Sequence, residues 1–521
     1  MAFPATARAA SLRLVSGAAV LLIPSLAQAS QGLAGQRFYF GDFHVHSGAS
    51  GDGFATDIGH GCAEQDGEVQ PCGAVSEIIQ VARANSLDFL ALTDHVNGEV
   101  RATATDFDAA LALVMQGHDP ASGFLTIPAG EIWVTPSDLV GGHLNLYFLA
   151  ENSALFDLGR QDFIHAMVDD KPSTTFESCE QLWVWMDQLE QDFGPVLILP
   201  HHPQMSDGMA TNWVCFGNDQ PHARRFTPAV EIYSRHGNST TLPAPYDPLW
   251  RADVEELHDL QAALDPDRWD LRLDLLASTD GHDTLPGDVC NNQGAYIHMP
   301  YGGGLAVAVL PESEPWSRAS LFEAIHARRT YATSGPMLPV LLDILADGER
   351  VGGMGEELVL AAEANIEAIL TIPSEHEGAI LQAFLRTPHE DIELAHGADG
   401  VYRATISRQD RPAWIYAVLR IDGDRWYGEQ GCDDGGDDRE ERIWLSPTWL
   451  DLPQTPDSGE DHDTDDEDED SKVDDSGPGD PAPTGCGGCA GAPSRAALAL
   501  VPAGLLCAWQ RRRRPAIVRS W

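Results

Sequence analysis

The feature that most constrains the fold of this chain is an alternation of short apolar runs with amphipathic stretches between residues 36 and 336. The apolar runs have the length of buried strands and include RFYFGDFHV, LDFLALTDH, PVLILPHH and LDLLASTDGH. The amphipathic stretches have helical spacing and include AVSEIIQVARANS and CEQLWVWMDQLEQDFG. Strands that alternate with helices are typical of the α/β class, which we predict for residues 36–336.

The pattern changes after residue 336. Segments such as LPVLLDILADGERV, ANIEAILTIP and AWIYAVLRIDG alternate apolar and polar residues and are separated by turn-forming residues. This pattern is typical of antiparallel strands. We therefore predict a small β-sandwich domain over residues 337–450, following an α/β domain over residues 36–336.

Both ends of the chain have the composition of targeting segments. Residues 1–29 contain an apolar core and end in Ala27-Gln28-Ala29, the pattern of a secretory signal peptide. Residues 451–485 are rich in acid, Ser, Pro and Gly and predict a disordered linker. Residues 486–521 hold an apolar stretch and an arginine block, and they resemble the MYXO-CTERM sorting tags of bacterial surface proteins. A plain tail anchor would give the same topology. We expect an exported protein attached to the membrane through this tail, at the cell envelope or surface, with later release left open.

Charge and cysteine content narrow the function classes. The formal net charge is −48, and the chain stays acidic outside the linker, so we expect no nucleic-acid partner. Six cysteines lie between the two ends, and export permits disulfides. Cys62 and Cys72 flank a short polar loop, and we predict that they form a disulfide.

Nearly every predicted strand carries a His, Asp or Glu at one end. His44 and His46 lie two residues apart on one strand, so both side chains point to the same face. In barrels of alternating strands and helices, active sites collect at the carboxyl ends of the strands. One such residue has a structural explanation, since Asp280 could open a turn. The whole set indicates a metal site instead: His44, His46, His95, Glu131, His143, His201, His202, Asp280 and His282. Imidazole and carboxylate ligands suit zinc, manganese or iron.

These motifs together resemble the PHP (polymerase and histidinol phosphatase) superfamily of metallohydrolases. The resemblance is carried by GDFHVHSGASGDG, DFLALTDH, GEIW, GHLNLY, LPHHP and LLASTDGHD, and it extends over most of residues 36–450. The pieces VEIYSRHGNS and LFEAIHARRTYATSGP are similar to one branch of that superfamily, catalogued as a domain of unknown function. The resemblance implies a distorted (β/α)7 barrel that holds two or three divalent transition metals in one cleft.

The resemblance also implies a ligand set. The first metal would take His44, His46, Glu131 and Asp280. Glu131 would bridge to a second metal that is also held by His143 and by His202, which the family pattern favours over His201. The third metal would take Asp52, His95 and His282. The insertion that contains Cys62 and Cys72 departs from the family pattern.

The expected activity follows from such a cluster. We predict a phosphoesterase that attacks a small anionic or ester substrate with a metal-bound hydroxide at a di- or trinuclear site. We assign catalytic roles to Glu131 and Asp280. Arg235 and His236 are candidates for gripping an anionic group, although a structural salt bridge would equally explain Arg235. We expect Asp94 to orient His95.

Two other functions stay open on the sequence. The same cluster could hydrolyse carbamate, ester or amide bonds, because metal hydroxide attacks carbon centres as well. Alternatively, the protein could be a surface binding protein with a non-catalytic barrel.

Overall fold

The computed structural model describes residues 32–50, 64–65, 68–69, 74–97, 104–134, 141–150, 176–205, 211–217, 220, 222–240, 258–282, 285–290, 302–407, 411–427 and 440–451. All of them belong to one compact unit, Met1–Pro456. The signal peptide over 1–29, the tail over 486–521 and all but the first residue of the linker over 451–485 lie outside the described residues and stay predictions. Among the helices that are described, none is both long and apolar enough to cross a membrane.

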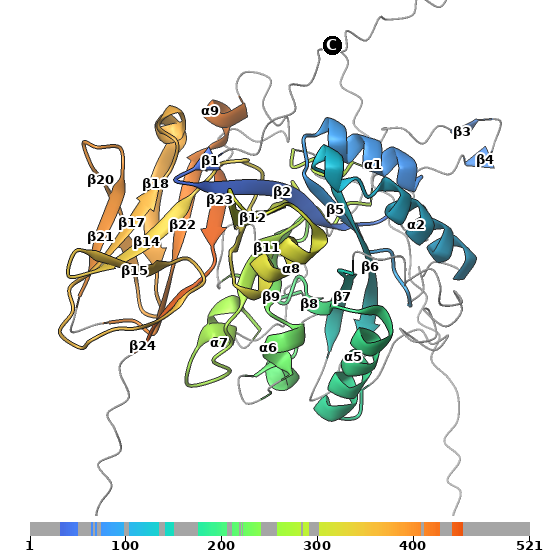
Figure 1. The fold of residues 1–521 in the computed structure, drawn as a ribbon, viewed down its shortest axis with the longest axis horizontal. Coiled ribbons are helices and arrows are strands. Elements are labelled where there is room, and N and C mark those ends of the chain that lie inside the picture. Colours follow the sequence, from blue (N-terminus) through green and yellow to red (C-terminus); the bar gives the residue numbers. More distant parts are fainter. Residues whose placement is uncertain are drawn as a thin grey trace, which may run out of the picture. The chain divides into compact units, whose positions relative to one another are not determined.

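The main sheet has fourteen strands (Figure 1). Along its hydrogen-bonded path run β16 (Glu357–Val359), β24 (Thr448–Asp451), β22 (Trp414–Asp422), β23 (Glu440–Leu445), β13 (Thr330–Thr333), β12 (Leu305–Pro311), β2 (Gln36–Val45), β5 (Phe89–Leu92), β6 (Leu125–Val134), β7 (Gly142–Phe148) and β8 (Val196–Pro200). Branching from this path are β1 (Gly32–Leu33), β18 (Ile380–Arg386) and β19 (Asp391–Glu393).

The predicted α/β class with a distorted (β/α)7 barrel is wrong, because the described residues form mainly strands, fourteen of them in one mixed sheet. Strands β2, β5 and β6 are parallel, with α1 (Val75–Ala84) and α2 (Ala104–Gly117) between them. However, β7 is antiparallel to both β6 and β8, and β12 is antiparallel to β2 and β13. A parallel neighbour needs a crossover of about a dozen residues or more. Only residues 135–141 separate β6 from β7, so the chain turns back, and the sheet is mixed.

Three smaller sheets complete the described strands. One contains β10 (Gly237–Asn238), β9 (Ala229–Ser234) and β11 (Asp274–Ala277), with β9 and β11 parallel. A five-stranded sheet contains β15 (Glu349–Gly353), β14 (Leu341–Ala346), β17 (Ile366–Thr371), β21 (Tyr402–Ile406) and β20 (Ala395–His396). The third is the ribbon of β3 (Glu64–Gln65) and β4 (Glu68–Val69).

The strands after residue 336 form two packed layers. The five-stranded sheet contributes Ile344 and Ala368 to an apolar cluster that also contains Ile415 and Leu419 of β22. Because β13 pairs with β23, the main sheet continues from one predicted domain into the other. The predicted domain boundary at residue 336 therefore stays a prediction. Hydrogen bonds of the main sheet join strands from both sides of that boundary.

The remaining helices are short, with one exception. α5 (Cys179–Phe193) begins where the Ser178 side chain accepts a hydrogen bond from the Gln181 amide at 3.2 Å, a standard N-cap. The other helices are α6 (Ala223–Phe226), α7 (Leu260–Leu264), α8 (Arg318–His326), α9 (Gly423–Tyr427), η1 (Pro120–Ser122), η2 (Trp213–Phe216) and η3 (Ser374–Ala379).

A disulfide that the sequence did not predict joins Cys179 of α5 to Cys215 of η2, with the two Cα atoms 5.1 Å apart. Cys290 is also disulfide-bonded, and its partner lies outside the described residues. The predicted partners Cys62 and Cys72 lie there too, so that pairing stays a prediction.

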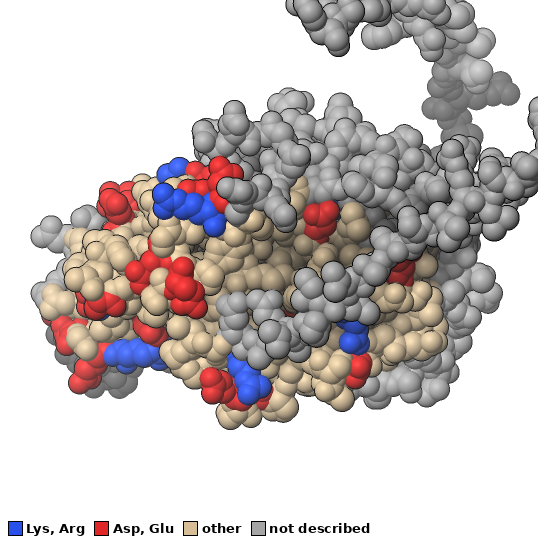
Figure 2. All heavy atoms as spheres, turned by 90° about the horizontal axis from the view of Figure 1, so that it is seen from above, with Lys and Arg blue, Asp and Glu red and all other residues tan. Residues whose placement is uncertain are grey.

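Charged side chains of both signs are scattered over the described part of the face in view (Figure 2), and acidic groups also occur without a basic neighbour. On the face in Figure 2, Lys and Arg side chains lie in small groups, with acidic side chains beside them. The described ion pairs include Arg386 with Asp391, Arg403 with Asp399, and Arg420 with Glu440. Exposed pairs of this kind contribute little to stability.

Candidate metal centre

The predicted ligands that the structure describes lie near the ends of strands from two sheets. His44 is the next-to-last residue of β2, His46 directly follows that strand, and His95 lies three residues past the end of β5. Backbone hydrogen bonds hold these ends together: the His46 amide donates to the Gly281 carbonyl at 2.8 Å, and the Glu131 amide donates to the Asp94 carbonyl at 3.1 Å. Neighbouring parallel strands therefore deliver their carboxyl ends to one place, as the sequence predicted.

The antiparallel direction of β7 explains why His143 lies near the start of its strand. In the β6–β7 ladder, Glu131 lies opposite Asn145, and Trp133 lies opposite His143. Glu131 and His143 are thus diagonal neighbours on one face. The amino end of an antiparallel strand meets the carboxyl ends of its neighbours, so β7 places its first residues in the cluster.

Two imidazole nitrogens and two carboxylate oxygens lie close together at the end of β2. Nε2 of His44 lies 3.2 Å from Nε2 of His46, and the two nitrogens lie 3.4 Å each from Oε2 of Glu131. The same nitrogens lie 3.2 and 3.3 Å from Oδ1 of Asp280. A tetrahedral cation about 2.0–2.1 Å from each ligand would separate these atoms by about 3.3–3.4 Å. The residues predicted for the first metal therefore fit a single cation.

Glu131 faces two groups of imidazoles with its two oxygens. Oε2 lies beside His44 and His46, whereas Oε1 lies 2.7 Å from Nδ1 of His143 and 3.3 Å from Nε2 of His201. This arrangement suits a carboxylate that bridges two cations. His201, which the sequence set aside in favour of His202, makes the contact with Glu131.

Several buried ligand atoms have no hydrogen-bond partner among the described residues. They include Nδ1 of His201 and Nδ1 of His202. A buried polar atom without a partner costs free energy. A neutral imidazole offers one nitrogen lone pair to a cation, so these buried rings fit a metal on this ground as well.

The predicted third position is described in part. His95 and His282 come together with His46, with one ligand atom from each within 4.8 Å of the others. Nδ1 of His282 lies 3.0 Å from the carbonyl oxygen of Asp280, and a proton on Nδ1 would put the ring's lone pair on Nε2. Asp52, the remaining predicted ligand, lies outside the described residues.

The buried charges balance one another. Burial alone would raise the pKa of Glu131, but the imidazoles around it, His95 first, hold it well below its usual range. Burial would likewise raise the pKa of Asp280, and His44 and His236 hold it well below. Both carboxylates are thus ionised at neutral pH, which a metal ligand must be.

The imidazoles divide into two kinds. Burial lowers the pKa of His201 to about 3, and it lowers the pKa of His143 and His202. These rings are neutral at pH 7, with lone pairs available to a metal. Burial would also lower the pKa of His44, but the Asp280 and Glu231 carboxylates raise it well above its usual value. Without a cation, a proton on His44 fills the same electrostatic role.

Sequence reasoning missed Glu231, a buried carboxylate in β9. Its Oε2 lies 3.2 Å from Nδ1 of His44, and Nδ2 of Asn145 lies 3.1 Å from the same nitrogen. A carboxylate on Nδ1 fixes the tautomer of a metal-binding His and leaves Nε2 for the cation. A Glu in the middle of the apolar run AVEIYS was the available signal.

Asp94 does not have the predicted contact with His95 among its described hydrogen bonds. Its carboxylate accepts from the Ser47 and Ser50 hydroxyls at 2.7 and 2.8 Å. Ser50 Oγ in turn lies 3.4 Å from Nδ1 of His46. Asp94 therefore holds the loop that follows His46 in place through these hydrogen bonds.

Arg235 and His236 lie in different settings. Arg235 is fully buried and donates from Nη2 to the Asp288 carbonyl at 3.1 Å, so part of its guanidinium is committed to the chain itself. His236 places Nε2 at 2.9 Å from Oδ2 of Asp280. It thus reaches the ligand cluster directly, and its use in substrate binding stays a prediction.

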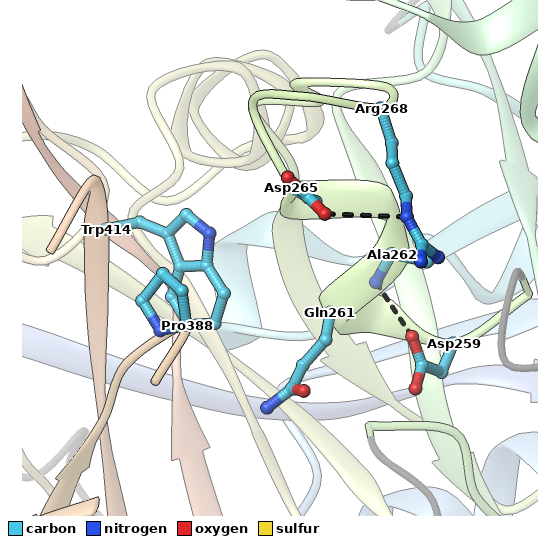
Figure 3. A pocket seen from close by; sticks show the side chains of 7 residues that line it. All are labelled: Asp259, Gln261, Ala262, Asp265, Arg268, Pro388 and Trp414. Atoms are coloured by element: carbon cyan, nitrogen blue, oxygen red, sulfur yellow. Dashed lines mark hydrogen bonds and ion pairs between the residues drawn. The ribbon is translucent and has the colours of Figure 1, made fainter. Parts of the chain in front are cut away.

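A separate cavity of about 270 Å³ lies between α7 and β22 (Figure 3). Its lining includes Asp265 and Arg268, which pair at 3.5 Å, and Asp259, which caps α7 by accepting from the Ala262 amide. It contains none of the predicted metal ligands. Its charged groups pair with one another or cap the helix.

Comparison with protein-family models and with curated proteins finds no match to this chain.

Proposed function

We propose that this protein is a metal-dependent hydrolase with phosphate esters as its favoured substrate class. The observation that carries the proposal is the set of five separations between 3.2 and 3.4 Å among ligand atoms of His44, His46, Glu131 and Asp280. The two imidazole nitrogens lie 3.2 Å apart, and each lies within 3.4 Å of the same two carboxylate oxygens, which is the spacing of ligand atoms around one cation.

The chain's own residues would have defined parts in this function. Bound divalent cations lower the pKa of a coordinated water and neutralise charge that develops on a substrate's oxygens. Glu131 shares its two oxygens between two groups of imidazoles, which holds the groups at a short, constant separation. Glu231 orients His44, and burial of the cluster keeps bulk water from weakening its electrostatic field.

The motifs around these residues also support a relationship to the PHP metallohydrolases. We propose that this relationship concerns the metal site and does not extend to a barrel fold. Export through residues 1–29 and membrane attachment through residues 486–521 are likewise part of the proposal.

The test is a comparison of substrates at known metal content. The full chain is stripped with a chelator, reloaded with zinc, manganese or ferrous iron, and assayed on p-nitrophenyl phosphate, bis-p-nitrophenyl phosphate, p-nitrophenyl acetate and a nitrophenyl carbamate. We expect phosphate-ester hydrolysis that disappears on stripping and returns on reloading. Hydrolysis of only the acetate or the carbamate would show that the enzyme attacks carbonyl carbon and not phosphorus. Undiminished turnover in the stripped enzyme would reject metal dependence.

A further inference from the structure

We propose that His202, His236 and Oδ2 of Asp280 hold a divalent cation at a position of their own, beside the positions that share Glu131. The sequence placed no cation there and reserved His236 for the substrate. Each of the three residues is buried and offers one ligand atom, and these atoms lie within 4.8 Å of one another. The inference deepens the proposed function, on which it rests for its catalytic use, but its test is metal content.

The first step of the argument is that Asp280 faces two ways. Oδ1 lies 3.2 and 3.3 Å from the Nε2 atoms of His44 and His46, within the first metal position. Oδ2 points to the other side, where it lies 2.9 Å from Nε2 of His236. Asp280 is therefore arranged as a second bridging carboxylate, alongside Glu131.

The second step is that His201 and His202 belong to different cation positions. Oε1 of Glu131 already contacts His143 and His201, which together make a ligand set for the second metal. The ring of His202 lies 5.1 Å from the ring of His236, at 71° between the planes. Nδ1 of His202 is buried and has no hydrogen-bond partner among the described residues. A cation shared with His236 and Asp280 would engage the lone pair of this ring.

The third step is backbone strain at two of the three residues. His202 and Asp280 have φ values of +34° and +52°, in the left-handed region that non-glycine residues seldom adopt. Such conformations cost free energy and persist where the surrounding structure imposes them. Here they aim an imidazole and a carboxylate at the same small volume.

The ligand chemistry identifies the class of cation. Two imidazoles and one carboxylate are a donor set for zinc, manganese or ferrous iron, and three protein ligands leave a coordination position open. The competing arrangement is a single cation shared by His143, His201 and His202, whose ligand atoms also lie within 4.8 Å of one another.

The experiment counts metals in variants of the full chain. Wild type, His143→Gln, His236→Gln and the double variant are dialysed to equilibrium against zinc, and zinc per chain is measured by elemental analysis and native mass spectrometry. The control is His396→Gln, an exposed imidazole on β20. We expect each single variant to lose one zinc, the double variant to lose two, and the control to lose none.

Two results would overturn the inference: an unchanged zinc count in His236→Gln, or a double variant that loses only one zinc. A zinc-loaded crystal of the wild-type protein gives the same test without any substitution. We expect an anomalous-scattering peak between His202, His236 and Asp280, and its absence at full loading would count against the site. Because neither readout requires turnover, a protein that binds this cation yet hydrolyses nothing would reject only the proposed function.

Discussion

Oε2 of Glu231 lies 3.2 Å from Nδ1 of His44, and Nε2 of the same ring faces three other ligand atoms. One imidazole thus connects a carboxylate in β9 to a cation position at the end of β2. Contacts of this kind hold a ligand in the orientation and tautomer that a metal requires.

We therefore expect Glu231→Gln to weaken zinc binding by about 10- to 100-fold, because the amide removes the negative charge that raises the basicity of His44. Competition with a chelator of known affinity measures the change. Glu393→Gln, at an exposed position of β19, is the matched control and should keep wild-type affinity. Equal affinity in Glu231→Gln and the control would show that Glu231 does not position His44.

Glu131→Gln and Asp280→Asn should each reduce hydrolysis to background. Both carboxylates belong to the four-atom set, and loss of a negative charge weakens the cation and raises the pKa of water bound to it. Turnover is measured at matched metal content, with circular dichroism to confirm folding. A variant that turns over at the wild-type rate would show that its carboxylate is not a ligand.

Replacement of Cys179 and Cys215 by Ala should lower the free energy of unfolding by about 2–4 kcal/mol. The disulfide closes a loop of 36 residues in sequence separation, and the unfolded chain gains entropy when that constraint is removed. Denaturant unfolding under non-reducing conditions measures the difference. Free thiols at both positions in the wild-type protein, detected by alkylation and mass spectrometry, would contradict the pairing.

Asp274 should make the protein less stable as pH rises from about 4 to 7. Burial raises its pKa to about 7, although hydrogen bonds from Ser446 and Thr330 oppose the shift. In this window the folded protein keeps a proton that the unfolded chain, with a pKa of about 3.9, releases. The folded state binds more protons, so the free energy of unfolding falls with pH, by up to about 1.4 kcal/mol per unit from this group.

The Asp274 prediction is checked by denaturant unfolding of metal-free wild type, Asp274→Asn and the control Asp424→Asn across pH 4–7. Asp424 is exposed on α9. We expect a shallower slope in Asp274→Asn alone. Parallel curves for all three proteins would mean that Asp274 is ionised in the folded state throughout.

The sequence by itself determined which residue types converge and where most strands lie. Strand periodicity predicted that His44 and His46 share a face, although β2 ends between them at Val45, and the apolar run LTIPAGEIWV indicated the strand that carries Glu131. These properties are local, because they depend on the side chains of a few consecutive residues.

Only the tertiary structure decided strand direction and the partners of each ligand. Whether β7 runs parallel or antiparallel to β6 depends on hydrogen bonds between strands, which no local pattern encodes, and the predicted barrel failed there. The contacts of Glu231 with His44 and of His236 with Asp280 join segments distant in sequence. Such contacts form only when packing brings the ends of distant strands together. The residue types fix which atoms can bind a metal, whereas the folded chain fixes the distances between those atoms.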